Sequence, residues 1–195
     1  MRVIAGSFRS RTLQAPAGLA TRPTSDRLRE TLFNVLAPRI QGADFLDLYA
    51  GSGAVGIEAL SRGAANVVFV ERAPAAIRVL RTNLDRVGLS EGYRIVPGSV
   101  GAYLRNMQGS PQFDVVFLDP PYDEMPEYAA TLELLGGPLA GVLAESALVI
   151  AEHRRKDVLE DRYGQLHRSR LLKQGETTLS FYARTSAIEE GLNDQ

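Results

Sequence analysis

The chain has 195 residues, of which 45% are hydrophobic and 23% charged, and its formal net charge is -1. This apolar share is typical of an ordinary globular domain and too high for a disordered chain. The chain contains no cysteine, which excludes disulfide scaffolds, cysteine–zinc sites and thiol nucleophiles. Two histidines, His153 and His167, are too few for a histidine-rich metal site, so we predict no metal and interpret both as ordinary structural residues.

The charge is unevenly distributed along the chain. Residues 1–40 contain seven arginines and two acidic residues, a net +5, whereas residues 41–195 carry a net -6. This pattern predicts a basic arm on an acidic body. No stretch approaches the roughly 20 apolar residues that a membrane span needs. The first residues do not resemble a signal peptide either, so we expect a cytoplasmic protein.

The first 40 residues are predicted to form a short hairpin and a helix. Residues 2–4 and 12–14 are strand-like and flank a turn-prone, arginine-bearing segment. A helix follows and ends before Pro38. The candidate N-caps of that helix are Thr24 and Ser25. Its apolar face carries Leu28, Leu32, Phe33, Val35 and Leu36, and we expect Arg27 and Arg29 on the opposite, exposed face.

From residue 44 onward, strand-like apolar runs alternate with helical segments. The five runs are residues 45–49, 67–71, 93–96, 113–118 and 147–151. Such runs are typical of a parallel sheet that is buried on both faces. Two further runs, 168–173 and 177–183, are separated by a short polar turn and predict an antiparallel hairpin. We therefore expect an α/β fold with a mostly parallel, seven-stranded sheet.

The predicted organisation has three parts. Residues 1–40 form the arm, residues 41–185 form the body with the sheet, and residues 186–195 form a polar, flexible tail.

A glycine-rich turn follows the first strand of the body, in the sequence Asp47-Leu48-Tyr49-Ala50-Gly51-Ser52-Gly53-Ala54-Val55-Gly56. In an open parallel sheet, such a turn lies at the carboxyl ends of the strands and above a helix N-terminus, where ligands bind. Glu71 ends the next strand and is placed to accept hydrogen bonds from a ribose diol. These features indicate a ribose-bearing cofactor, which is either NAD or S-adenosylmethionine.

The position of Asp47 favours S-adenosylmethionine. A carboxylate just before the first glycine would repel the pyrophosphate of NAD, whereas it suits the amino or sulfonium group of S-adenosylmethionine. The pattern Asp-x-x-x-Gly-x-Gly, followed by an acid after the second strand, resembles class I S-adenosylmethionine-dependent methyltransferases, whose fold is Rossmann-like. On this interpretation the cofactor-binding residues are Asp47, Tyr49, Gly51, Gly53 and Glu71. The glycine turn by itself is also compatible with an NAD-dependent oxidoreductase, which is the alternative.

A second motif, Asp119-Pro120-Pro121-Tyr122, directly follows the fourth strand. In the methyltransferases that it resembles, this motif marks transfer to an exocyclic or amide nitrogen. The resemblance implies that the Asp119 side chain and the Pro120 carbonyl accept the two amine hydrogens, which localises the nitrogen lone pair. Tyr122 would stack on the base and orient it. The motif alone does not separate guanine N2 from adenine N6 or a glutamine amide, so an N6-adenine methyltransferase is a second alternative.

The N-terminal segments extend this resemblance to one family. Residues 2–6, 11–13, 21–24, 26–30 and 32–34, together with 47–63 and 119–122, are similar to the RsmD family. Its members are bacterial enzymes that methylate N2 of one guanine in 16S ribosomal RNA. The resemblance implies S-adenosylmethionine as cofactor, small-subunit RNA as substrate, and no metal or covalent intermediate. The cofactor site would extend to Ser99 and Val100, where many methyltransferases of this class carry an aspartate in place of the serine.

Arginine supplies 20 of the 22 basic residues, and its guanidinium group suits both phosphate binding and base stacking. The arginines predicted to contact RNA are Arg9 and Arg11 in the hairpin turn, with Arg22, Arg27 and Arg29 around the helix start. An RNA-binding assembly factor with an inactive cofactor site is disfavoured by the intact second motif.

Overall fold

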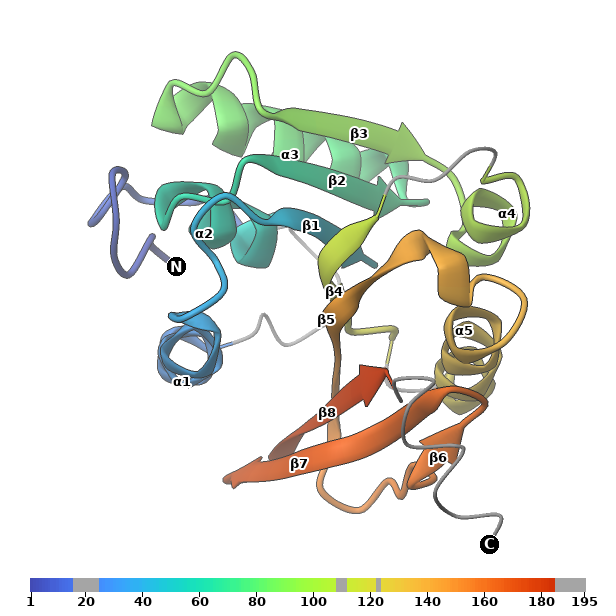
Figure 1. The fold of residues 1–195 in the computed structure, drawn as a ribbon. Coiled ribbons are helices and arrows are strands. Elements are labelled where there is room, and N and C mark those ends of the chain that lie inside the picture. Colours follow the sequence, from blue (N-terminus) through green and yellow to red (C-terminus); the bar gives the residue numbers. More distant parts are fainter. Residues whose placement is uncertain (16–24, 108–111, 122–123, 185–195) are drawn as a thin grey trace, which may run out of the picture.

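The computed structural model describes residues 1–15, 25–107, 112–121 and 124–184. Within these residues the chain forms an eight-stranded sheet with helices on both faces (Figure 1). The strand order is β3-β2-β1-β4-β5-β8-β7-β6. The strands are β1 (Asp44–Leu48), β2 (Asn66–Glu71), β3 (Tyr93–Pro97), β4 (Phe113–Leu118), β5 (Leu143–Arg154), β6 (Arg162–Tyr163), β7 (Leu166–Gln174) and β8 (Thr177–Arg184). The helices are α1 (Asp26–Leu36), α2 (Ala54–Ser61), α3 (Pro74–Val87), α4 (Val100–Arg105), α5 (Met125–Gly136) and the short 3-10 helix η1 (Ala140–Val142).

The first five strands pair in parallel, as the continuous apolar runs predict. The central strand β1 lies between β2 and β4, and Asp47 is aligned with Phe69 on one side and Phe117 on the other. Because parallel strands all end at the same edge, the residues that follow β1, β2 and β4 meet there. The glycine turn, Glu71 and Asp119 are therefore neighbours at one edge of the sheet.

Helices lie on both faces of this sheet (Figure 1), and an apolar core fills the space on each face. On one face, which we call the α2 face, the sheet packs against α1, α2, α3 and the N-terminal hairpin. On the other face it packs against α4 and α5. Successive strand residues point to opposite faces. Phe117 belongs to the core on the α2 face and Leu118 to the core on the other face. By this alternation, Asp119 lies on the α2 face.

The C-terminal strands confirm the predicted antiparallel hairpin, because β7 pairs with β8 and β8 pairs with β5. The strand count is a correction: the sheet has eight strands, where the sequence predicted seven. The additional strand is β6, which pairs two residues with β7. Two residues carry no alternating pattern, so periodicity gives no signal for such a strand.

The N-terminal hairpin is smaller than predicted. Its two arms are joined by one isolated antiparallel bridge, between Arg2 and Thr12. The backbone N–H of Val3 donates to the Arg11 carbonyl at 3.0 Å, and the N–H of Leu13 donates to the Met1 carbonyl at 3.0 Å. The side chains of Val3 and Leu13 are buried in the core on the α2 face. The hairpin is thus held on the body by packing, and the division into arm and body stays a prediction.

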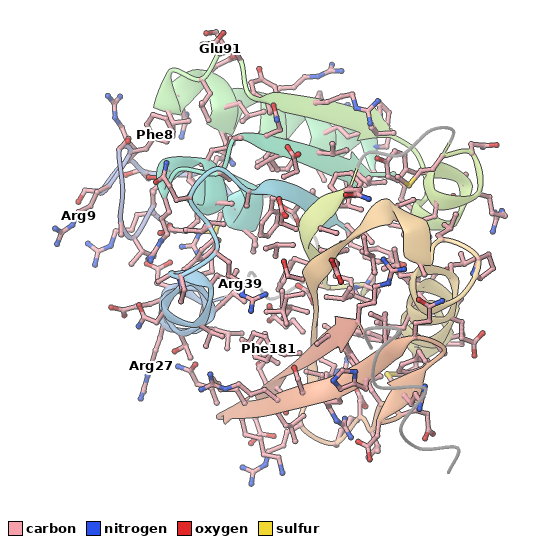
Figure 2. The ribbon with its side chains drawn as sticks, in the orientation of Figure 1. Phe8, Arg9, Arg27, Arg39, Glu91 and Phe181 are labelled. Atoms are coloured by element: carbon pink, nitrogen blue, oxygen red, sulfur yellow. The ribbon has the colours of Figure 1, made fainter. Side chains whose placement is uncertain are left out.

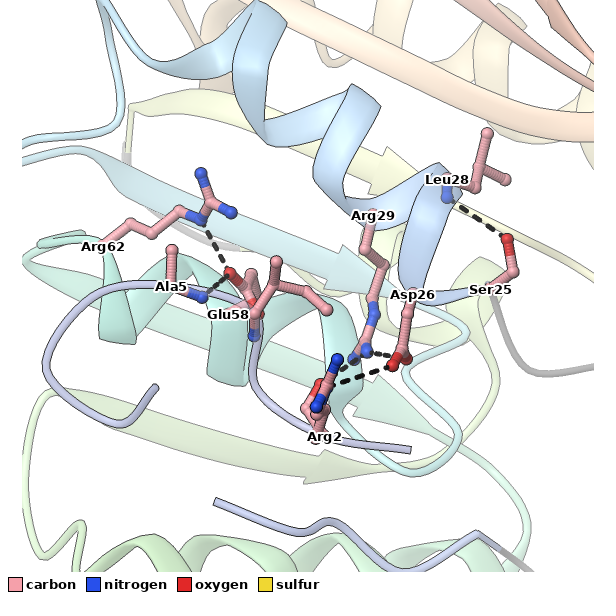
Figure 3. A network of polar contacts seen from close by, with 9 residues as sticks. Arg2, Ala5, Ser25, Asp26, Leu28, Arg29, Glu58 and Arg62 are labelled. Atoms are coloured by element: carbon pink, nitrogen blue, oxygen red, sulfur yellow. Dashed lines mark hydrogen bonds and ion pairs between the residues drawn. The ribbon is translucent and has the colours of Figure 1, made fainter. Parts of the chain in front are cut away.

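The helix α1 begins where the sequence predicts, because the Ser25 hydroxyl accepts a hydrogen bond from the Leu28 N–H at 3.2 Å. Arg29 is a correction. The sequence placed it on the exposed face with Arg27, but its side chain is fully buried. Its Nη2 donates at 2.6 Å to both Asp26 Oδ1 and the Arg2 carbonyl (Figure 3). A buried guanidinium cannot reach RNA, so Arg29 instead ties α1 to the N-terminal segment.

A second buried ionic group joins the hairpin to α2 (Figure 3). Glu58 is fully buried, and its carboxylate accepts hydrogen bonds from the N–H groups of Ile4 at 2.7 Å and Ala5 at 3.0 Å. The Nε of Arg62 donates to the same carboxylate at 2.7 Å. These contacts satisfy a charge that would otherwise be costly to bury. In the part of the chain that the structure describes, no helix is long and apolar enough to cross a membrane.

Candidate active site

The glycine turn between β1 and α2 leaves open space above the start of the helix. Gly51 and Gly53 have φ angles of +55° and +77°, which side-chain-bearing residues adopt rarely. A Cβ atom on Gly51 would find only the Tyr49 carbonyl oxygen, at 3.9 Å. The turn is closed by a 2.8 Å hydrogen bond from the Gly53 N–H to the Ala50 carbonyl. The turn is therefore open at Gly51, whereas Gly53 is packed against α3, where a Cβ atom would lie 2.1 Å from Leu80 Cδ1. The open side lies near the N-terminus of α2, a place that suits a ligand with hydrogen-bond acceptors.

Asp47 lies inside the sheet below this turn and is 2% exposed. Its Oδ2 accepts a hydrogen bond from the Gly56 N–H at 3.0 Å. Burial raises the pKa of Asp47 to about 7, the Gly56 bond opposes that shift, and the charge of Glu71 adds to it. A bound cation would favour the ionised form of this carboxyl group.

Glu71 is half-buried at the end of β2 and helps to shape the turn. Its Oε2 accepts from the Gly51 N–H at 2.8 Å, and its Oε1 accepts from the Ala73 N–H at 2.7 Å. Each carboxylate oxygen has a further lone pair, so both can still accept a hydrogen bond from a ligand hydroxyl. The carboxylate is thus oriented by the backbone beside the open turn.

Tyr49 has an uncommon backbone conformation, with a φ of +63°. Its hydroxyl donates to Glu127 Oε2 at 2.8 Å and lies 3.1 Å from the hydroxyl of Thr131, both on α5. The side chain is therefore directed to α5, which follows the second motif.

Ser99 and Val100 stand at the start of α4. The Ser99 hydroxyl accepts from the Ala102 N–H at 3.3 Å and caps the helix, a role that the sequence interpretation did not include. Ser99 is exposed and lines a hollow of about 520 Å³ together with Arg94 and Tyr103. Val100 is buried in the second core, so only its backbone is available to a ligand.

The second motif begins at the end of β4, next to the glycine turn. Asp119 follows Leu118, which is paired with Ala151 of β5, and Glu152 follows Ala151. Burial raises the pKa of Asp119 well above its usual range, and the negative charges of Glu152 and Asp47 raise it further. Asp119 is thus one of three carboxyl groups close together on the α2 face. Tyr122 lies outside the described residues, so the predicted stacking contact stays a prediction.

The structure places three of the predicted RNA-contacting arginines on the surface. Arg9, Arg11 and Arg27 are exposed. Figure 2 shows Arg9 at the hairpin turn and Arg27 on α1, both directed away from the body. Arg11 reaches the end of α3, where its Nη1 donates to the Arg86 carbonyl at 3.4 Å. Arg22 lies outside the described residues.

His153 agrees with the structural role that the sequence analysis gave it. It is buried, and its Nε2 lies 2.8 Å from the Ser180 hydroxyl on the neighbouring strand. Among the residues that the structure describes, no group of three or more His, Asp or Glu side chains is arranged to hold a metal ion.

Two buried polar side chains, Glu152 and Asn83, lie at the site but were not predicted from the sequence. Glu152 is 2% exposed on β5 beside Asp119. Asn83 on α3 is fully buried, and its Nδ2 donates to the Ser52 carbonyl of the glycine turn at 2.9 Å. Both had a signal. Glu152 is an acid directly after a buried apolar run, and Asn83 lies among the apolar positions of its helix, beside Leu80 and Leu84.

Comparison with known proteins follows from this geometry. A family model described as "Conserved hypothetical protein 95" matches residues 1–183. The chain is 37% identical over 185 residues to "Putative rRNA methyltransferase YlbH" of Bacillus subtilis, covering 94% of this chain and 99% of that protein. It is 41% identical over 152 residues to "Ribosomal RNA small subunit methyltransferase D" of Escherichia coli K12, covering 78% and 74% of the two chains.

A solved structure supports the same relationship. "Putative methyltransferase yhhF from Escherichia coli" superposes with a TM-score of 0.81 at 37% identity, covering 94% of this chain and 97% of that one. A more distant structure, "Crystal structure of SMU.776, a putative methyltransferase complexed with SAH", has a TM-score of 0.63 at 14% identity and therefore shares the fold alone.

Proposed function

The chain belongs to the RsmD family, and from this premise we propose that it transfers a methyl group from S-adenosylmethionine to the N2 amine of a guanine in 16S ribosomal RNA. The observation that carries the proposal is the position of Asp119 and Pro120 beside the glycine turn, on neighbouring parallel strands. The proximity of the two motifs supports a site in which acceptors for an amine lie next to the proposed methyl donor.

The residues around the turn fit S-adenosylmethionine. The chemistry that this cofactor supplies is a methyl group activated by a positively charged sulfur. Asp47 offers a buried carboxyl group to a positive charge, and Glu71 offers oriented oxygens to the ribose hydroxyls. The open space above Gly51 accommodates ligand atoms that a side chain would displace. Ser99 and the backbone of Val100 are proposed to contact the adenine.

Asp119 and Pro120 are proposed to bind the target amine. The lone pair of an aromatic amine is delocalised into the ring, which makes the nitrogen a poor nucleophile. Hydrogen bonds from the two amine hydrogens to the Asp119 carboxylate and the Pro120 carbonyl localise that lone pair, and their benefit grows as positive charge develops on the nitrogen. The proton that the amine releases passes to Asp119 or to water. Tyr122 is proposed to hold the base by stacking.

The RNA is proposed to lie along the hairpin and α1. Arg9 and Arg27 lie on this side of the molecule (Figure 2), and Arg11 of the same hairpin is also exposed. Guanidinium groups bind phosphate oxygens with two hydrogen bonds, so these residues suit an RNA backbone. Arg22 is proposed to act with them. The target guanine must be single-stranded or flipped out, since a paired base cannot expose its amine to Asp119.

Two measurements test the proposal. Calorimetric titration should give saturable binding of S-adenosylmethionine and none of NAD. Small ribosomal subunits from cells that lack the protein should then accept labelled methyl from the cofactor when the protein is added. The assignment would be refuted if the protein bound NAD and not S-adenosylmethionine. It would also be refuted if the RNA carried no labelled methyl group after complete incubation.

A further inference from the structure

The side chain of Asn83 makes an unusual set of contacts for a helix residue. Asn83 lies near the C-terminal end of α3, and it is fully buried. A buried amide is costly unless its polar atoms are hydrogen-bonded. Both amide N–H groups of Asn83 and its carbonyl oxygen have partners, and all of these partners are backbone groups.

Two of the contacts go to Gln14, at the end of the N-terminal hairpin. The Oδ1 of Asn83 accepts from the Gln14 N–H at 2.7 Å, and its Nδ2 donates to the Gln14 carbonyl at 3.0 Å. The amide thus pairs with Gln14 as a neighbouring strand would. Gln14 is followed within two residues by the segment 16–24, which contains Arg22. Asn83 therefore fixes the end of the hairpin that carries Arg9 and Arg11, two of the predicted RNA-contacting residues.

The third contact goes to the glycine turn. The Nδ2 of Asn83 donates to the Ser52 carbonyl at 2.9 Å. On the other side of the same peptide group, the Gly53 N–H donates to the Ala50 carbonyl at 2.8 Å. The Ser52–Gly53 peptide is held at both ends, which sets its orientation at the start of α2. This is the turn where the cofactor is proposed to bind.

We propose that Asn83 is a positioning residue that couples the RNA-contacting N-terminal segment to the cofactor turn, so that RNA and cofactor each strengthen the binding of the other. The inference rests on the proposed function, because it takes the two ligands from there. One side chain holds both elements in place. A ligand that orders either element reduces the conformational freedom that the other ligand would have to remove. By linkage, the two effects are equal in size.

Among the described residues, the other side chains that bind the hairpin backbone lie farther from the glycine turn. Glu58 and Ser61 bind the backbone of the hairpin from the second half of α2, away from the turn. Asn83 therefore has a role that these residues do not share. Thr82, the residue before Asn83 on α3, supplies a matched control, since it is exposed and its hydroxyl donates to the Arg78 carbonyl of its own helix.

The first experiment measures the dissociation constant of S-adenosylhomocysteine, with and without saturating small ribosomal subunits from cells that lack the protein. We expect the subunits to tighten binding by about fivefold or more in the wild type, a typical coupling between two sites. In Asn83→Ala the ratio should fall to about one, while Thr82→Ala keeps the wild-type ratio. An unchanged ratio in a folded Asn83→Ala protein overturns the inference.

The second experiment needs no variant. Hydrogen exchange of the Gln14 N–H requires its bond to Asn83 to open, so S-adenosylhomocysteine alone should slow exchange in residues 10–15 by a few fold. Equal exchange with and without it overturns the coupling. Failure of the proposed function gives a different result, because the wild-type protein would then bind no S-adenosylhomocysteine or no subunits. Binding of both without coupling refutes only the role of Asn83.

Discussion

The Asp47 carboxylate accepts a hydrogen bond from the Gly56 N–H, 3.0 Å away, and so joins the end of β1 to the first turn of α2 across the glycine turn. This bond satisfies only part of a buried carboxyl group whose pKa burial raises to about 7. The charge of Asp47 therefore changes near neutral pH.

The affinity for S-adenosylmethionine should depend on this ionisation. We expect binding to tighten by up to about tenfold between pH 6 and pH 8, because Asp47 becomes negative over that range and the cofactor is positive. The variant Asp47→Asn keeps an acceptor for Gly56 but does not titrate. Calorimetric titration of both proteins across this range measures the effect, and an equal pH dependence in both would contradict it.

The stability of the protein should show the opposite trend with pH. Because the pKa of Asp47 is higher in the folded state than in the unfolded chain, its contribution is fully present below about pH 4 and is lost as pH rises through about 7. We expect the free energy of unfolding to fall less between pH 5 and pH 8 in Asp47→Asn than in the wild type. Urea unfolding at these pH values measures it, and identical slopes would refute the assignment.

Substitution at Asp119 should separate turnover from cofactor binding. We expect Asp119→Ala to lower kcat by about 100-fold or more, the scale seen when one preorganised hydrogen-bonding group is removed from a reacting centre. Asp119→Asn retains an acceptor oxygen and should keep more activity. Cofactor affinity should change little in either variant. Equal activity in Asp119→Ala and the wild type would rule out the proposed catalytic role.

The surface arginines should govern the salt dependence of RNA binding. Combined replacement of Arg9, Arg11 and Arg22 by Ala should weaken binding and reduce the slope of log affinity against log salt by about two, since each phosphate contact releases counterions. Binding to small ribosomal subunits at several salt concentrations measures both quantities. A triple variant with unchanged affinity and slope would place the RNA elsewhere.

Arg29 provides the contrasting case on the same helix. Arg29→Ala removes a buried partner of Asp26 and of the Arg2 carbonyl. We expect it to lower the free energy of unfolding by about 1–3 kcal/mol, because the Arg2 carbonyl loses its hydrogen-bond partner while the Asp26 side chain, 44% exposed, can still be hydrated. In the folded variant protein, the slope of log RNA affinity against log salt concentration should equal the wild-type value. A stable variant with a reduced slope would restore Arg29 to the RNA surface.

Much of the fold follows from local patterns in the sequence. The continuous apolar runs of β1, β2 and β4 predict a parallel sheet, and the glycine turn and the second motif are placed correctly at its carboxyl edge. The strand β6 is different, because a two-residue strand is determined by its partner β7 rather than by its own sequence.

The errors concern buried polar side chains. Arg29 has helical spacing from Leu32, Phe33 and Leu36 that places it on the apolar face, but its charge argued for exposure. The burial is supported by Asp26, three residues earlier on the same helix, and by the Arg2 carbonyl. The spacing from Asp26 is visible in the sequence, but the contact with Arg2 depends on the tertiary fold. The contacts of Asn83 likewise join residues 31 and 69 positions apart in the chain.

The most direct test of the account is nucleoside analysis of 16S ribosomal RNA from cells with and without this protein. We expect N2-methylguanosine at one position to be lost without the protein and to return with the wild type but not with Asp119→Ala. Loss of N6-methyladenosine instead, or an unchanged set of methylated nucleosides, would contradict it.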